Sequence, residues 1–184
     1  MWTSSQAKIT RRLCLNGLLI TVAMMLSYLE VLIPFELLLP LPGFKLGLAN
    51  TVTVLTLVLV SKADAALVSA MRILLMGLLF GTPVSLFFSI SGGLLAYLAL
   101  LLSARFLRRC SHCGVSVLCA AAHNMGQLLA AAWLFGAEIT LSYLPILLTA
   151  ALLSGSLTGL LLNAAIPRLE KILRPTPHGG NSRS

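Results

Sequence analysis

The feature that most constrains this chain is a succession of long apolar segments, separated by short polar or proline-containing connections. Hydrophobic residues make up 58% of the sequence and charged residues only 10%. Soluble domains usually contain about 25% charged residues, so this chain cannot cover its surface with charge. A helix of about 20 apolar residues is long enough to cross the roughly 30 Å hydrocarbon core of a bilayer. The pattern therefore predicts an all-α membrane protein.

The lengths of the apolar segments predict six transmembrane helices in a single transmembrane domain, residues 13–166. A short segment, residues 1–12, precedes this domain, and a polar tail rich in proline and glycine, residues 167–184, follows it. We expect the tail to be partly disordered. The second and third predicted helices are short for a full span. The six helices are predicted at residues 13–33, 46–60, 65–80, 84–103, 115–135 and 141–166.

The basic residues indicate the orientation of these helices. Six crossings place both termini on one side of the membrane, and nearly all the lysines and arginines fall on that side. Cytoplasmic connections are enriched in lysine and arginine, so we expect both termini in the cytoplasm and the protein in the bacterial cytoplasmic (inner) membrane. The net charge of +8 follows this topology, so nucleic acid is not expected as a partner.

Polar side chains inside membrane spans are costly and often functional. Arg72 keeps its charge, so it needs an anion, carbonyl groups or water. One interpretation is that Arg72 pairs with Glu30 and fixes two helices together. Another is that Arg72 and Lys45 bind a phosphate or carboxylate of a small molecule. Residues 34–44 would then form a lid over this molecule. The expected binding residues are Lys45, Asn50, Arg72, Ser89, His123, Asn124 and Gln127.

Small residues predict two places where helices approach closely. Gly92 and Gly93 belong to a track of small side chains along the fourth predicted helix, which we interpret first as a packing surface. Ala23 and Ser27 form a weaker pair, one turn apart, on the first predicted helix. This pair is a candidate face for docking a partner protein.

The sequence lacks the patterns that catalysis would require. No phosphate-binding Gly-x-x-x-x-Gly-Lys-Ser/Thr loop occurs, and Asp64 is the only aspartate, so clustered aspartates that hold magnesium are missing. The spacing Cys110-Ser111-His112-Cys113 is that of half a zinc site, but no second Cys/His pair follows. We therefore expect a protein without catalytic or metal-binding residues that is not itself an enzyme.

Four motifs resemble those of the Gx transporter family, which is also labelled heptaprenyl diphosphate synthase component I. The motifs are Gly43-Phe44-Lys45-Leu46-Gly47-Leu48-Ala49-Asn50, Arg72 with Leu78-Leu79-Phe80-Gly81, Ser89-x-Ser91-Gly92-Gly93, and His123-Asn124-x-Gly126-Gln127. The resemblance implies kinship with the S components of energy-coupling factor (ECF) transporters. Those proteins have six helices and cytoplasmic termini, capture vitamins, and dock on a T component that two ATPases drive. Their docking motif, Ala-x-x-x-Ala, corresponds here to Ala23-x-x-x-Ser27.

Three functions are consistent with these observations. The first is uptake of a small anionic or polar cofactor, and the resemblance suggests a flavin such as riboflavin or FMN. The second is a non-catalytic membrane subunit of a heptaprenyl diphosphate synthase, with Arg72 and Lys45 holding the diphosphate. The third is an assembly factor for a membrane redox complex.

Overall fold

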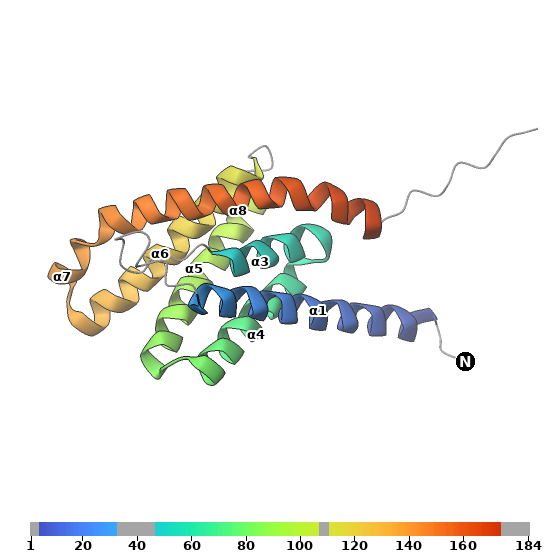
Figure 1. Cartoon of the computed structure of the whole chain (residues 1–184), viewed down its shortest axis with the longest axis horizontal. Coiled ribbons are helices and arrows are strands. Elements are labelled where there is room, and N and C mark those ends of the chain that lie inside the picture. The colour runs from blue at the N-terminus through green and yellow to red at the C-terminus, as the bar shows by residue number, and fades with distance from the viewer. Residues whose placement is uncertain (1–3, 33–46, 107–110, 174–184) are drawn as a thin grey trace, which may run out of the picture.

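The computed structural model of the chain describes residues 4–32, 47–106 and 111–173. Every regular element in these three stretches is an α-helix, which confirms the predicted all-α fold (Figure 1). The helices are α1 (Ser4–Leu32), α3 (Leu48–Leu59), α4 (Lys62–Phe80), α5 (Pro83–Phe106), α6 (His112–Phe135), α7 (Ala137–Leu141) and α8 (Leu144–Leu173).

The long helices have the length and composition of membrane spans. Within the described residues, five helices (α1, α4, α5, α6 and α8) are long and apolar enough to cross a membrane. Most residues in each span lie on the surface of the bundle, so wide apolar faces are available to lipid. The chain is therefore a multi-pass membrane protein. The helix α3 has only 12 residues, about 18 Å at 1.5 Å per residue, which agrees with its predicted short length.

Several helix boundaries differ from the prediction. The helix α1 begins at Ser4 instead of residue 13, so residues 4–12 of the predicted N-terminal segment are helical. A separate short helix, α7, covers Ala137–Leu141, and α8 begins at Leu144 instead of residue 141. The helix α4 begins at Lys62 instead of residue 65, because Ser61 caps it: the Ser61 hydroxyl accepts a hydrogen bond of 3.2 Å from the Asp64 backbone N–H. The helix α8 continues through Pro167 to Leu173, so residues 167–173 of the predicted tail are helical. Residues 174–184 lie outside the described part of the chain.

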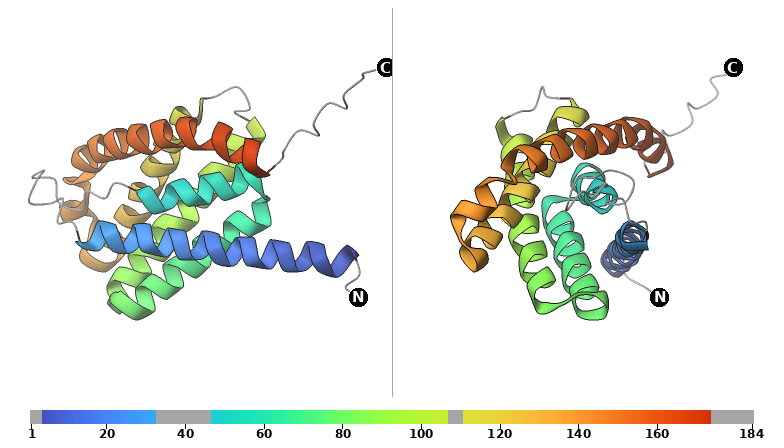
Figure 2. Two further views of the ribbon diagram at one scale, coloured as in Figure 1. Left: turned by 45° about the vertical axis from the view of Figure 1, so that its right-hand side comes forward. Right: turned by 60° about the vertical axis from the view of Figure 1, so that its left-hand side comes forward.

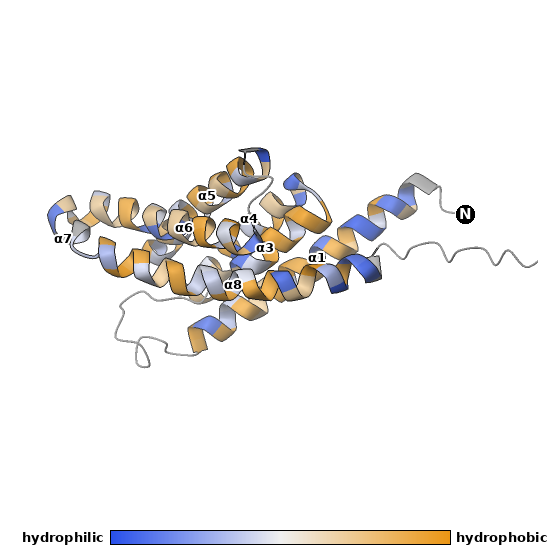
Figure 3. Cartoon of the chain, turned by 90° about the horizontal axis from the view of Figure 1, so that it is seen from above, coloured by the Kyte–Doolittle hydropathy of each residue, from blue (hydrophilic) through white to orange (hydrophobic). Residues whose placement is uncertain are grey.

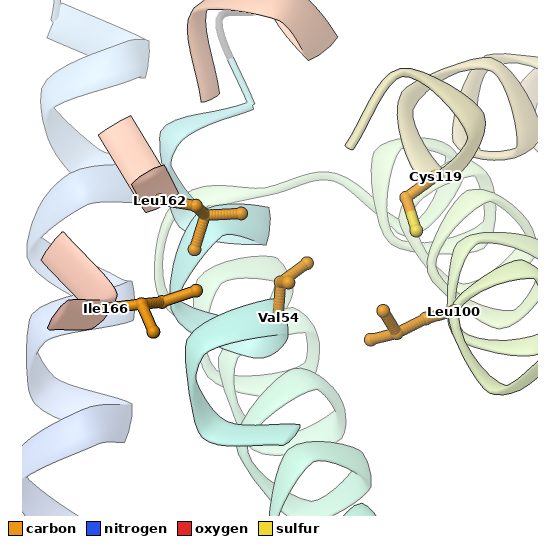
Figure 4. Packing of buried hydrophobic residues seen from close by; sticks show 5 residues of the cluster. All are labelled: Val54, Leu100, Cys119, Leu162 and Ile166. Atoms are coloured by element: carbon orange, nitrogen blue, oxygen red, sulfur yellow. The ribbon is translucent and has the colours of Figure 1, made fainter. Parts of the chain in front are cut away.

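The short helix α3 lies in the middle of the bundle, in contact with α1, α4 and α8 (Figure 2). Its start is fixed by Gly47, whose φ of 70° belongs to the left-handed region that favours glycine. Val54 of α3 packs in a buried cluster with residues of α5, α6 and α8 (Figure 4). The other members of this cluster are Leu100, Cys119, Leu162 and Ile166.

Glycines hold α6 close to its two main neighbours, α5 and α8. A Cβ atom on Gly92 of α5 would lie 2.9 Å from the His123 carbonyl oxygen of α6, so the packing role predicted for this glycine is confirmed. On the other side of α6, a Cβ atom on Gly155 of α8 would lie 2.5 Å from the Val117 Cα atom. Such spacings leave no room for a side chain between the helix backbones.

Both chain ends lie at the same end of the bundle. Figure 1 shows the beginning of α1 and the end of α8 on one side of the molecule, and Figure 3 shows hydrophilic residues on both of these segments. Here Arg12 of α1 forms an ion pair of 2.9 Å with Asp64 of α4. The Asn16 side chain donates a further hydrogen bond of 2.6 Å to the Asp64 carboxylate. Asp64 is only 3% exposed.

The prediction that Ala23 and Ser27 of α1 form a face for docking a partner protein is wrong, because neither side chain lies on the surface of the bundle. Ala23 is fully buried in a cluster with Val52 and Val68, and Ser27 is 8% exposed. Both small residues face the interior of the bundle, where they let α1 approach α3 and α4. A partner protein therefore has no access to this pair in the structure.

Candidate functional site

Arg72 lies near the middle of α4 and directs its guanidinium toward α1 and α3. Its Nη2 atom donates a hydrogen bond of 3.1 Å to the Asn50 Oδ1 atom, and its Nη1 atom donates a long one of 3.5 Å to the Ser27 hydroxyl. The Nε–H group is buried and has no hydrogen-bond partner among the described residues. A guanidinium has five N–H donors, so these two contacts leave much of its capacity for a bound group.

Glu30 lies on the same side of the bundle as Arg72. Its carboxylate accepts a hydrogen bond from the Leu48 backbone N–H and thus joins the last turn of α1 to the first turn of α3. It also interacts electrostatically with Arg72. The hydrogen bonds that the structure gives to Arg72 go to Ser27 and Asn50. Glu30 therefore balances part of the Arg72 charge. It also fixes the first turn of α3, the helix turn that contains Asn50.

Asn50 accepts a hydrogen bond from Arg72 and also lines two small cavities, each with a volume of about 20 Å³. Thr51 and Thr53, its neighbours on α3, extend to different sides of that helix. One cavity lies between α3, α6 and α8, and Thr51, Ser116 and Ser154 help to line it. The other lies mainly between α3, α4 and α5, and Thr53, Ser69 and Tyr97 help to line it. The interior around Asn50 is therefore rich in hydroxyl groups.

The remaining predicted binding residues of α5 and α6 lie at helix contacts. His123 and Gln127 both lie against Gly92, where α6 crosses α5. The Asn124 amide donates a hydrogen bond of 2.8 Å to the Leu147 carbonyl oxygen and so ties α6 to α8. Ser89 is half-buried on α5. The structure brings Arg72 and Asn50 into contact, and the described contacts of His123, Asn124 and Gln127 lie instead where α6 meets α5 and α8.

Two parts of the predicted site lie outside the described residues. These are Lys45 and the lid, residues 34–44.

Sequence reasoning missed Ser27 as a partner of Arg72, and Thr51 and Ser116 as buried hydroxyls. Single serines and threonines in apolar helices carry no signal of depth or direction. By contrast, Gly155-x-x-x-Gly159 is a recognisable signal for close helix packing, and it marks the contact of α8 with α6.

The described residues contain no group of three or more His, Cys, Asp and Glu side chains placed to hold a metal ion. His112 instead shares a hydrogen bond of 3.0 Å with Asn163 of α8, and Cys110 lies outside the described residues.

The helices and their interior polar groups define a class of protein: a multi-pass helical membrane protein with a half-buried arginine and several buried hydroxyl groups in its interior. The sequence model of a family described as heptaprenyl diphosphate synthase component I matches residues 19–165. The chain therefore belongs to the heptaprenyl diphosphate synthase component I family, in agreement with the resemblance seen in its motifs. A family described as one component of a synthase also agrees with the prediction that this chain is not itself an enzyme. No curated protein and no solved structure matches the chain.

Proposed function

We propose that this chain is a non-catalytic membrane subunit of a polyprenyl diphosphate synthase, and that Arg72 binds the diphosphate group of a prenyl diphosphate. Membership of the component I family supports the assignment to a synthase. The observation that carries the binding role is the Arg72 guanidinium, whose Nε–H is buried without a protein partner. A planar guanidinium binds phosphate oxygens through two parallel N–H donors, and it does so more strongly in an apolar environment.

The apolar part of the ligand fits the rest of the bundle. Isoprenoid chains are hydrocarbons, so they partition into lipid and against apolar helix faces. The helices beside Arg72 present such faces: Tyr28 and Leu29 of α1 and Leu74 of α4 are exposed on the surface of the bundle. A prenyl chain would lie along these faces while its diphosphate reaches Arg72 and Asn50. Lys45 would then be a second cation for the same group.

The subunit would act together with a catalytic chain. Prenyl transfer needs magnesium bound by clustered carboxylates, and Asp64, the only aspartate, is engaged by Arg12 and Asn16. We infer that a partner subunit supplies these carboxylates and that this chain holds the growing, membrane-soluble product. The interior position of Ala23 and Ser27 supports a synthase partner over an ECF T component, because the S-component docking motif has no outward-facing counterpart here.

Binding of farnesyl diphosphate to the purified protein in mild detergent tests the role of Arg72. We expect Arg72→Gln to weaken binding about 10- to 100-fold, because a hydrogen bond to a charged group contributes about 1.5–3 kcal/mol and 1.4 kcal/mol corresponds to a factor of ten. Arg72→Lys, which keeps the charge but loses the planar fork, should give an intermediate affinity.

The matched control is Arg168→Gln, which removes the same charge from an exposed position on α8. This variant should bind like the wild type. Equal affinities for the wild type and Arg72→Gln, with both proteins folded, would show that the diphosphate does not bind at Arg72.

A second function, uptake of a small anionic or polar cofactor such as FMN or riboflavin, is favoured by the position of Arg72. Ser27, Glu30 and Asn50 surround it in the half of the bundle away from the Arg12–Asp64 pair and the chain ends. With cytoplasmic termini, this half would face the outside, where an uptake protein captures its cargo. With FMN as the cargo, Arg72 would bind the phosphate, and the hydroxyls around Asn50 would bind the neutral part of the molecule.

A further inference from the structure

The cavity between α3, α6 and α8 is lined by two residues whose hydroxyl groups lack hydrogen-bond partners in the described part of the chain. These are the Oγ1 atom of Thr51 and the Oγ atom of Ser116, and both atoms are buried. Ser116 is only 4% exposed. A buried hydroxyl without a partner loses its hydrogen bonds with bulk water and gains nothing in return. Two such groups facing one cavity therefore require a common explanation.

The size of this cavity matches a single water molecule. A site needs at least about 10–15 Å³ to hold one water, and this cavity has about 20 Å³. A prenyl chain or a flavin ring is far too large for this volume. The cavity therefore selects the smallest partner that can both donate and accept hydrogen bonds.

The walls of the cavity also supply enough polar partners. A buried water typically makes about three hydrogen bonds, within a range of two to four. Thr51 and Ser116 provide two groups, and Ser154 and Thr158 provide two more hydroxyls among the lining residues. The Thr158 hydroxyl already donates to the Gly155 carbonyl oxygen at 3.0 Å, so it can still accept a hydrogen bond. Asn50 lines the same cavity.

We propose that this cavity is a binding site for one structural water molecule, which bridges Thr51 of α3 to Ser116 of α6 and to the hydroxyls of α8. The water links the short helix α3 to α6 and α8, on the side of α3 opposite α1. Because α3 carries Asn50, the bridge is a positioning device for the hydrogen bond of 3.1 Å between Asn50 and Arg72. This proposal does not depend on which ligand Arg72 binds.

Substitutions that remove the hydroxyls give opposite results for a wet and a dry cavity. With the water present, Thr51→Val and Ser116→Ala each remove a hydrogen bond, and the unfolding temperature should fall by about 2–4 °C. In a dry cavity the same substitutions remove an unpaired buried hydroxyl, and the unfolding temperature should rise. Because the two residues share one water, the double variant should lose less than the sum of the two single shifts.

The matched control is Thr56→Val on the same helix. Thr56 is fully buried, and its hydroxyl donates to the Val52 carbonyl oxygen of its own helix at 2.7 Å. Thr56→Val shows how much the loss of a hydroxyl that bonds only within its own helix changes the unfolding temperature, and the shift of Thr51→Val is compared with it. An unchanged or higher unfolding temperature in both cavity variants would overturn the proposal.

A measurement on the unaltered protein keeps the test independent of how the variants fold. An experimental structure at a resolution that shows ordered waters should contain one density peak within hydrogen-bond distance of both Thr51 and Ser116. A well-ordered map without this peak would also overturn the proposal.

Discussion

At the scale of single residues, Arg72 and Asp64 show how an apolar bundle accommodates charge. Asp64 is almost fully buried, yet Arg12, Asn16 and Ser61 all donate hydrogen bonds to it. Arg72 interacts electrostatically with Glu30 and donates hydrogen bonds to Ser27 and Asn50, but its Nε–H has no hydrogen-bond partner among the described residues. A charge that is fully satisfied by its own helices serves the fold, whereas one that is partly satisfied is suited to a ligand.

The structural role of Asp64 gives a prediction at this scale. Asp64→Asn removes the negative charge that faces Arg12 and weakens the link between α1 and α4. We expect the unfolding temperature in detergent to fall by a few degrees. Farnesyl diphosphate should still bind at the temperature where both proteins are folded, because Asp64 lies in the first turn of α4, whereas Arg72 lies near the middle of that helix and makes its hydrogen bonds to Ser27 and Asn50. An unchanged unfolding temperature would show that the pair contributes nothing to stability.

The sequence singled out Arg72 as a charge within a membrane span and named Asn50 and Glu30 as neighbours, but it missed Ser27. A cation in an apolar segment is visible from hydropathy alone, so Arg72 stood out. Which residues face it depends on how the helices rotate and cross, and a serine such as Ser27 in an apolar helix does not reveal this. For the same reason His123 and Asn124 were grouped with Arg72 by depth, although their described contacts lie at the interfaces of α6 with α5 and α8.

At the scale of helices, packing depends on glycines that allow backbones to touch. In a membrane no hydrophobic effect drives apolar helices together, so close van der Waals packing contributes much of the association. The helix α6 is held in this way on both sides, at Gly92 of α5 and at Gly155 and Gly159 of α8. The positions of the helices could be predicted from apolar segment lengths. Their partners could not, since those depend on small residues far apart in sequence.

Two glycines in different surroundings test this packing. Gly155→Ala would place a Cβ atom 2.5 Å from the Val117 Cα atom, and backbone atoms cannot move aside easily. We expect a loss of stability of about 1–3 kcal/mol from the forced separation of α6 and α8.

The control is Gly17→Ala on α1, where an added Cβ atom would meet nothing within 4 Å. This variant should be as stable as the wild type or slightly more stable, because alanine favours helix by about 0.5–1 kcal/mol over glycine. Thermal unfolding of both variants decides the question. Equal stability of the two would argue against a close contact at Gly155.

At the scale of the whole molecule, the bundle separates a structural end from a binding region. The chain ends and the Arg12–Asp64 pair lie at one end, while Arg72, Asn50 and Glu30 lie toward the other. The short helix α3 connects the two, since it starts beside Glu30 and packs its remaining turns against α1, α4 and α8. The proposed binding of a prenyl diphosphate by its anionic head group would use the part of the bundle that contains Arg72, Asn50 and Glu30.

The measurement that tests the central claim most directly is the identification of the molecule that the protein carries. The wild type and Arg72→Gln are purified gently from the same cells, and their released ligands are compared by mass spectrometry. We predict a polyprenyl diphosphate in the wild type that is strongly reduced in Arg72→Gln. A released flavin that depends on Arg72 would contradict the synthase assignment in favour of uptake. Wild-type protein that carries no anionic ligand, or equal ligand in both proteins, would contradict the anion-binding role of Arg72.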